Sequence, residues 1–181
     1  MARQWQSQIA KFKLPVFEPV DRSQAEFLKQ RTASMLETVP MYASLRKKLL
    51  DIGGVDIVPP VIDVSSTAQL ARQCYDVSQT LHRGRTWLGA GAKVVEMGAN
   101  NCHLNVARLR TSRCGHIASG WALSIDGLWR EHSWLVKSVG TASEYLIETT
   151  VSWLLYHGYI LNDEEMDWFI HAELGTNPLQ Q

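Results

Sequence analysis

The stretch WALSIDGLWREHSWLV, residues 121–136, carries the clearest β-strand signal in the chain. Its two halves, 121–125 and 128–136, are rich in apolar and aromatic residues and flank Asp126-Gly127, the preferred dipeptide of a type I′ hairpin turn. Residues 145–150 have a similar character and supply a third strand. The middle of the chain therefore predicts an antiparallel sheet.

Helical segments precede this sheet. Ser23–Glu26 has the form of a capping box, which predicts a helix that begins near Gln24 and that Pro40 ends or kinks. A second helical segment, 41–50, stops before a Gly-Gly pair, and a third covers 67–81. Apolar residues recur at helical spacing in the third segment and include Cys74, so we expect that cysteine to pack as a small core residue.

The segments between these helices and the hairpin are shorter. Residues 55–64 are β-branched but contain two adjacent prolines, which confine them to an edge strand or an extended linker. Residues 82–92 are rich in glycine and arginine and should form a loop, whereas 93–97 form a candidate strand. A turn at 98–101 then leads into a helix that should begin near Cys102.

The last part of the chain predicts an apolar segment followed by a helix. Periodicity does not decide whether 153–161 is a strand or a buried helix. Asn162, followed by three acidic residues, predicts the start of a final helix. The order of these elements predicts an α+β fold. We expect one domain, 1–181, with a helical N-terminal region at 1–65 and a core at 66–181.

The charge and hydropathy of the chain argue against several classes of protein. Eighteen basic and eighteen acidic residues cancel, so there is no electrostatic reason to expect nucleic acid or a membrane surface as a partner. We find neither a signal-peptide pattern nor a stretch of about twenty apolar residues. Three cysteines, Cys74, Cys102 and Cys114, are too few for a disulfide framework. We therefore expect a cytoplasmic protein with reduced thiols.

Cys102, His132 and Glu148 occur in successive predicted elements, a helix and two strands. They are the parts that a thiol nucleophile needs: a sulfur, a base that takes its proton, and an acid that orients the base. A helix N-terminus and a nearby imidazolium both lower the pKa of a thiol. The N–H groups at the helix start, with the side chain of Asn100 or Asn101, are candidates to stabilise an oxyanion.

Side chains close to these three in sequence each have two interpretations. His103 directly follows the cysteine and is either structural or in contact with substrate. Trp134 is a candidate to cover the histidine and the acid and to exclude water from them. Trp134, Trp121 and Trp129 either fill the core or line a substrate cleft.

These motifs resemble those of the papain-like cysteine enzyme superfamily, in which a cysteine at a helix start precedes a histidine and an acid in consecutive strands. The transglutaminase-like branch is the most similar, because its members often show His-Ala-Trp and Asp-x-Thr where this chain has His132-Ser133-Trp134 and Glu148-Thr149-Thr150. The strings Asn-Cys-His-x-Asn-Val and Gly-x-Ala-Leu-Ser-x-Asp-Gly-Leu-Trp also resemble a bacterial family of uncharacterised activity. This chain departs from the branch in having Glu in place of Asp and a short interval between cysteine and histidine.

The resemblance implies a papain-like or transglutaminase-like core. It also implies that Cys102 is the nucleophile, His132 the general base and acid, and Glu148 the group that orients the histidine. The reaction would be hydrolysis or acyl transfer through a thioester at an amide, peptide or glutamine-type carbonyl. The substrate would be a protein, a peptide or a small amide, and neither a cofactor nor a metal would be needed.

Two alternative functions stay open at the level of sequence. The departures from the branch fit a non-catalytic binding or assembly module that keeps the fold without the chemistry. Cys102, His103, Cys114 and His116 are candidate zinc ligands, although their spacing lacks the usual Cys-x-x-Cys pair.

Overall fold

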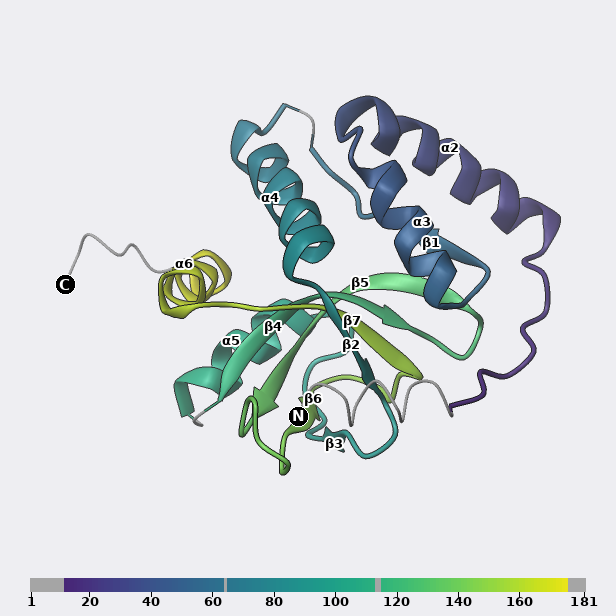
Figure 1. The fold of residues 1–181 in the computed structure, drawn as a ribbon. Coiled ribbons are helices and arrows are strands. Elements are labelled where there is room, and N and C mark those ends of the chain that lie inside the picture. Colours follow the sequence, from purple (N-terminus) through teal and green to yellow (C-terminus); the bar gives the residue numbers. More distant parts are fainter. Residues whose placement is uncertain (1–11, 64, 113–114, 176–181) are drawn as a thin grey trace.

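The computed structural model describes residues 12–63, 65–112 and 115–175 and confirms an α+β fold. Within these residues, a curled sheet of seven mostly antiparallel strands packs against five α-helices (Figure 1). The helices are α2 (Arg22–Thr38), α3 (Tyr42–Ile52), α4 (Thr67–Arg83), α5 (Cys102–Ser112) and α6 (Asp163–Leu174). The strands are β1 (Asp56–Val58), β2 (Arg85–Leu88), β3 (Lys93–Val94), β4 (His116–Leu123), β5 (Leu128–Lys137), β6 (Tyr145–Glu148) and β7 (Leu155–Ile160).

The long strand β5 organises the sheet, whose strand order is β2-β7-β4-β5-β6-β3 with β1 as an additional partner of β5. All of β4 pairs antiparallel with one edge of β5. On the other edge, β1 pairs in parallel with Leu128–Arg130 and β6 pairs antiparallel with Leu135–Lys137. Among the described residues, no strand pairs with this edge at 131–134. We call this unpaired stretch the edge gap.

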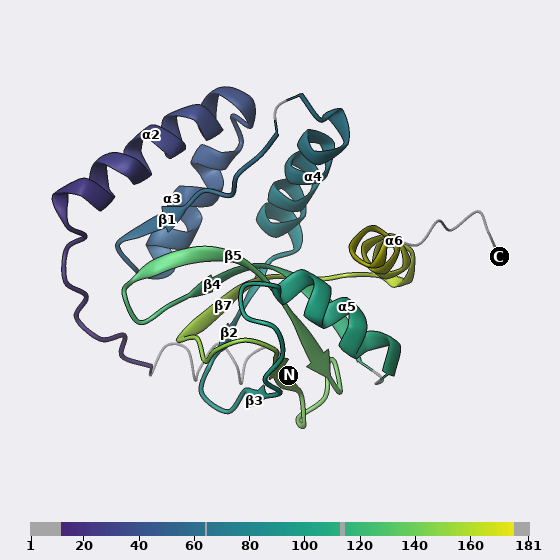
Figure 2. The same ribbon diagram turned by 180° about the vertical axis from the view of Figure 1, so that it is seen from behind.

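One face of the sheet is covered by two groups of helices (Figures 1 and 2). Side chains alternate between the faces along a strand, and the odd-numbered apolar residues of β4 and β5 face the helices. Trp121 and Trp129 pack with α2, α3 and α4, whereas Ile117 and Leu135 pack with α5 and α6. The even-numbered residues of these strands therefore point to the opposite, concave face.

The concave face is filled by aromatic side chains from the sheet itself. Trp87, Trp134 and Tyr156 form a buried cluster there. The Trp134 ring centroid lies 5.5 Å from that of Trp87 in an edge-to-face contact and 5.0 Å from that of Tyr156. The curl of the sheet is what brings side chains from β2, β5 and β7 together.

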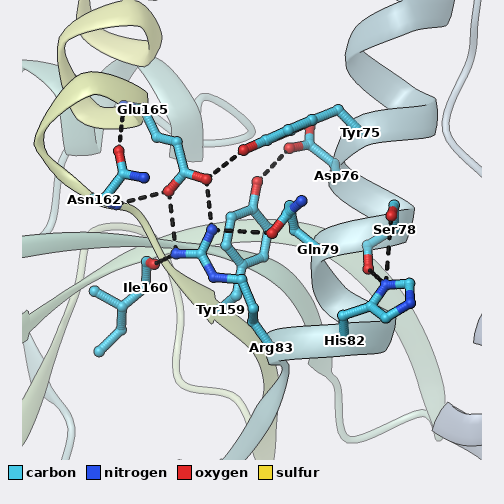
Figure 3. Close-up of polar contacts among 10 residues, drawn as sticks. All are labelled: Tyr75, Asp76, Ser78, Gln79, His82, Arg83, Tyr159, Ile160, Asn162 and Glu165. Atoms are coloured by element: carbon cyan, nitrogen blue, oxygen red, sulfur yellow. Dashed lines mark hydrogen bonds and ion pairs between the residues drawn. The ribbon is translucent and has the colours of Figure 1, made fainter.

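Polar contacts hold α6 against α4 and β7 (Figure 3). Arg83 donates to the two carboxylate oxygens of Glu165 at 2.5 and 3.2 Å, and the Tyr75 hydroxyl donates to the same carboxylate. The Tyr159 hydroxyl donates to the Asp76 carboxylate at 2.6 Å. Since α6 also packs on α5, these contacts support the helix that begins with Cys102.

The hairpin at 121–136 is confirmed, but the predicted type I′ turn is wrong. That turn requires positive φ at both central residues, and in this loop only Gly127 has it, with φ of 80°. The N–H of Gly127 donates to the Ser124 carbonyl at 3.0 Å, and the N–H of Ser124 donates to the Leu128 carbonyl at 3.1 Å. The connection is therefore a three-residue loop that ends in a left-handed glycine.

The predicted helices are present, although one cap differs. Ser23–Glu26 does not form the expected capping box, because Asp21 caps α2 by accepting from the N–H groups of Ser23 and Gln24 at 2.9 and 3.0 Å. The predicted final helix is confirmed, and Asn162 caps it. The Asn162 side chain accepts a hydrogen bond from the N–H of Glu165, and the Glu165 side chain accepts one from the N–H of Asn162. Cys74 packs against the core as expected. No helix in the described part of the chain has the length and apolar character needed to cross a bilayer.

Strands occupy two segments whose secondary structure the sequence left open, and one segment that was predicted to be a loop. Residues 153–161 contain strand β7, and the described part of 55–64 contains β1, which pairs only with β5 as an edge strand does. The loop predicted at 82–92 is wrong, because this segment contains the end of α4 and strand β2. Burial of Trp87 on the concave face stabilises that strand despite the flanking glycines.

Two facing glycines permit a close approach of strands beside β5. Gly120 of β4 lies opposite His132 of β5 on one side and Gly158 of β7 on the other. A Cβ atom on Gly120 would lie 2.3 Å from the His157 carbonyl oxygen and 2.5 Å from the Gly158 Cα. Both distances are far below van der Waals contact, so the strands approach here more closely than a side chain allows.

We expect Gly120→Ala to lower the free energy of unfolding by about 1–3 kcal/mol, because the added methyl group forces β7 to move away from β4. Urea unfolding of the purified variant measures the loss. Gly98→Ala is the control, since its Cβ would meet its nearest atom at 3.5 Å, and its effect should stay within about 0.5 kcal/mol. Equal losses in the two variants would contradict a steric constraint at Gly120.

Candidate active site

Cys102 is the first residue of α5, and a tight turn leads the chain into it. Asn100 in this turn has a φ of 58°, a left-handed conformation that asparagine tolerates better than most residues. The Asn105 side chain donates to the Gly98 carbonyl at 2.6 Å and so ties the turn to the helix. The N–H of Asn105 donates to the Asn101 carbonyl at 2.8 Å. The N–H groups that precede Asn105 in the helix therefore have no acceptor within it.

His132 and Glu148 lie on the concave face and come from neighbouring strands. His132 is in the edge gap of β5, and Glu148 is the last residue of β6. The His132 Nε2 lies 2.8 Å from the Glu148 Oε2, and the two residues are only 2% and 0% exposed. Because Nε2 is engaged by the carboxylate, Nδ1 is the ring nitrogen left for the thiol.

The Glu148 carboxylate has donors on both of its oxygens. It accepts from the N–H groups of Thr149 and Thr150 at 2.7 and 2.8 Å, from the Thr150 hydroxyl at 2.9 Å and from the Tyr156 hydroxyl at 2.8 Å. Burial alone would raise the pKa of Glu148, but His132 and these donors hold the pKa below its ordinary value. The residue is therefore an ionised acid inside the protein at neutral pH.

Cys102 and His132 line the same cavity, and His103 follows the cysteine in α5. Burial alone would raise the pKa of the Cys102 thiol, but the nearby imidazoles of His103 and His132 lower that pKa to about 5. Burial likewise opposes protonation of His132, but Cys102 and Glu148 together raise its pKa to about 9. At neutral pH the arrangement favours a thiolate beside an imidazolium.

A cavity of about 450 Å³ opens at Cys102 and His132. The partly exposed Cys102 borders this cavity together with the buried His132. Asn100 lines this cavity, whereas Asn101 uses its side chain to donate to the Ala99 carbonyl at 3.1 Å. The lining residues are Glu96, Met97, Ala99, Asn100, Cys102, Arg130, Glu131, His132, Thr150, Val151 and Trp153.

His103 lies outside the cavity wall. Its Nδ1 is 2.7 Å from the Ser133 Oγ, and its ring makes an edge contact with Phe169 of α6 at 5.9 Å between centroids. Ser133 points to the helix-covered face of β5. His103 thus contacts β5 and α6, is partly exposed and does not line the cavity.

The tryptophans divide between the core and the cavity. Trp134 is fully buried and stacks on His132, with 6.3 Å between ring centroids and 13° between ring planes. It covers the histidine and does not line the cavity. Trp121 and Trp129 are buried among the helices, so of the two interpretations these three tryptophans follow the core one. The tryptophan in the cavity wall is Trp153, whose ring centroid lies 4.8 Å from that of His132.

Two members of the site were not identified from the sequence. Trp153 and Tyr156 fall in the apolar segment whose secondary structure was ambiguous, so nothing in the pattern placed them near Glu148. A physical signal did exist: a buried carboxylate needs donors, and a buried tyrosine needs a partner for its hydroxyl. Those two needs point to a buried tyrosine as a partner of Glu148, but they do not distinguish Tyr156 from Tyr159 in the same segment.

The candidate zinc ligands do not form a cluster in the described residues. Among these, no group of three or more His, Cys, Asp or Glu side chains is arranged to hold a metal ion. Cys102 and His103 belong to the arrangement above, and His116 begins β4 with an exposed side chain. Cys114 lies outside the described residues.

We compared the chain with protein-family models, with curated proteins and with solved structures, and none of the three comparisons gave a match. The geometry of the site is therefore the basis on which its chemistry can be inferred.

We expect Tyr156→Phe to lower the free energy of unfolding by about 1.5–3 kcal/mol at pH 7, because Glu148 loses a donor inside the protein. Because the folded protein lowers the pKa of Glu148, ionised Glu148 stabilises the fold at any pH above the ordinary pKa of a glutamate. This stabilisation disappears as the pH falls through the pKa of Glu148 in the folded protein. The difference in the free energy of unfolding between Tyr156→Phe and the parent should therefore shrink in acid. Urea unfolding at several pH values measures it.

Tyr145→Phe on β6 is the matched control, because Tyr145 contacts the Lys93 ammonium through its ring at 4.2 Å. Its stability should change little and should show no acid-dependent difference. A Tyr156→Phe difference that stays constant from pH 7 into the acid range would show that the hydroxyl does not act through the carboxylate.

Proposed function

We propose that this protein is a cysteine-dependent hydrolase or acyltransferase that acts on an amide, peptide or glutamine-type carbonyl through a thioester intermediate. One observation carries the proposal. Cys102 begins helix α5 and lines one cavity with His132, and the His132 Nε2 lies 2.8 Å from the buried Glu148 carboxylate. A sulfur, a base and an orienting acid in this arrangement meet the requirements of a thiol nucleophile.

In the first half of the reaction, the Cys102 thiolate attacks the substrate carbonyl carbon and forms a carbon–sulfur bond. The electron pair of the carbonyl moves to its oxygen, and the free N–H groups at the start of α5 and the Asn100 side chain are the nearby donors for this oxyanion. As the carbonyl reforms, the carbon–nitrogen bond breaks and His132 gives its proton to the leaving amine. The products are a thioester on Cys102 and a free amine.

In the second half, neutral His132 takes a proton from water or from an acceptor amine as that molecule attacks the thioester carbon. The carbon–sulfur bond then breaks, and the sulfur leaves as a thiolate beside the renewed imidazolium. Glu148 keeps its negative charge throughout and stabilises the protonated histidine. Attack by water gives hydrolysis, and attack by an amine gives transfer.

We also propose that the core belongs to the papain-like superfamily and to its transglutaminase-like branch. In support, the cysteine begins a helix that packs on β5, and the histidine and the acid follow on the adjacent strands β5 and β6. Glu148 differs from the Asp that the branch often has, but its side chain still reaches the histidine.

We expect iodoacetamide to alkylate Cys102 at neutral pH much faster than Cys74, with a rate that rises through an inflection near pH 5. This inflection follows from the thiol pKa of about 5, whereas an ordinary thiol ionises near pH 8.5. Peptide mass spectrometry after timed labelling follows each cysteine. Cys102→Ser should remove the fast phase, and an inflection above pH 8 for Cys102 itself would contradict the proposal.

His132→Gln should separate the two halves of the reaction with p-nitrophenyl acetate as the acyl donor. The phenolate leaves without a proton, so Cys102 can still be acylated, but deacylation lacks its base. We expect about one equivalent of p-nitrophenolate per protein, followed by a steady rate reduced by about 10²–10⁴-fold. Stopped-flow absorbance measures both phases. A steady rate equal to that of the parent would exclude His132 as the base.

A further inference from the structure

We propose that Glu144 is a positioning residue for His132, which it orients through the rings of Trp87 and Trp134. This role rests on the proposed function, because it concerns the histidine that serves as the base of that reaction. Glu144 directly precedes β6 and does not line the cavity at Cys102, so it acts on the reaction only through other side chains.

Glu144 is a buried carboxylate with hydrogen-bond donors on both of its oxygens, and only 7% of the residue is exposed. One oxygen accepts from the indole N–H of Trp87 at 2.9 Å, and the other accepts from the N–H of Gly140 at 2.8 Å. The Arg85 guanidinium donates to both oxygens, at 2.9 and 3.0 Å. Burial alone would raise the pKa of Glu144, but these donors hold the pKa below its ordinary value. The carboxylate is therefore charged at neutral pH and held in one position.

The hydrogen bond from Trp87 to Glu144 fixes the indole ring from across the concave face. Trp87 belongs to β2, whereas Glu144 directly precedes β6, and β7, β4 and β5 lie between these two strands in the sheet. The Arg85 guanidinium also lies over the Trp87 ring, with its Cζ 4.4 Å from the ring centroid. The indole is thus held at its N–H by the carboxylate and at its face by the cation.

Trp134 depends on such neighbours for its own orientation. It is fully buried, and among the described residues its indole Nε1 has no hydrogen-bond partner. Trp87 meets it edge to face, with 5.5 Å between ring centroids and 81° between ring planes, and Tyr156 packs on it at 5.0 Å between centroids. Since protein interiors leave little free space, a tilt of the Trp87 ring moves the Trp134 ring as well.

Trp134 in turn restricts the plane of the His132 ring. Glu148 holds the His132 Nε2 at 2.8 Å, but a single hydrogen bond leaves the ring free to rotate about the direction of that bond, and this rotation moves Nδ1. The Trp134 ring lies nearly parallel to the imidazole, at 13°, and Trp153 contacts the imidazole from the cavity wall. A fixed indole against the ring therefore keeps Nδ1 in the direction that proton transfer requires.

The test measures turnover of p-nitrophenyl acetate by Glu144→Ala, Trp87→Phe, the double variant of these two, and Glu144→Gln. Deacylation needs a correctly placed His132, whereas acylation by this ester releases a phenolate that needs no proton. We therefore expect Glu144→Ala to keep a burst of about one equivalent of p-nitrophenolate per protein. Its steady rate should fall by about 10–100-fold, and stopped-flow absorbance measures both phases.

Two further variants assign the effect to the contact with Trp87. Trp87→Phe keeps an aromatic ring but cannot donate to Glu144, so its steady rate should also fall. The double variant should be no slower than the slower single variant, because both changes break the same contact. Glu144→Gln keeps a carbonyl oxygen that can accept from Trp87, and its steady rate should stay within about threefold of the parent.

Asp21→Ala controls for a general loss of stability. Asp21 caps α2, which packs on the helix-covered face of the sheet, by accepting from two N–H groups. Removing this cap destabilises the helix without touching the aromatic cluster, so the steady rate should not change. Circular dichroism establishes that each variant is folded at the temperature of the assay.

The outcomes separate this inference from the proposed function. A parent protein whose turnover survives Cys102→Ser would overturn the proposed function and the role of Glu144 with it. An active parent and an unchanged steady rate in folded Glu144→Ala would leave the proposed function intact and overturn the positioning role. If Glu144→Ala does not fold, an unchanged steady rate in Trp87→Phe overturns that role equally. Losses that multiply in the double variant would show that Glu144 does not act through Trp87 and would also overturn the inference.

Discussion

The burial of the Glu148 carboxylate is the constraint on which the rest of this structure depends. Removing an ionised acid from water costs several kcal/mol, so the fold must supply partners for it. Tyr156 supplies one of them at 2.8 Å, although β6 and β7 are separated in the sheet by β4 and β5. In a flat sheet those two strands would lie about 14 Å apart. The contact therefore requires a strong curl, which the Gly120–Gly158 approach permits, and the concave face results.

The edge gap helps to explain how a cysteine on the helical layer lies near a histidine of the opposite face. The helix that carries Cys102 packs on the covered face, whereas His132 and Glu148 point to the concave one. Cys102 and His132 line one cavity at the part of β5 that β1 and β6 leave unpaired. The N-terminal region takes part in this arrangement, since β1 sets one limit of the gap.

Local patterns in the sequence were sufficient for the helices and for the central hairpin. The helix at Cys102, the hairpin and the acid on the next strand follow from periodicity and turn chemistry. In the structure Cys102 and His132 line one cavity, and His132 contacts Glu148. Strand β2, the cavity position of Trp153 and the contacts of His103 with Ser133 and Phe169 depend instead on packing between distant elements, and periodicity does not encode such packing.

The edge gap has a consequence for the behaviour of the protein in solution. An unpaired strand edge is a template on which another chain can add a strand, and proteins protect such edges by covering them. Helix α5, which begins with Cys102, packs on β5. Loosening this helix would therefore expose more of β5 to other chains at the same time as it moved Cys102 away from His132.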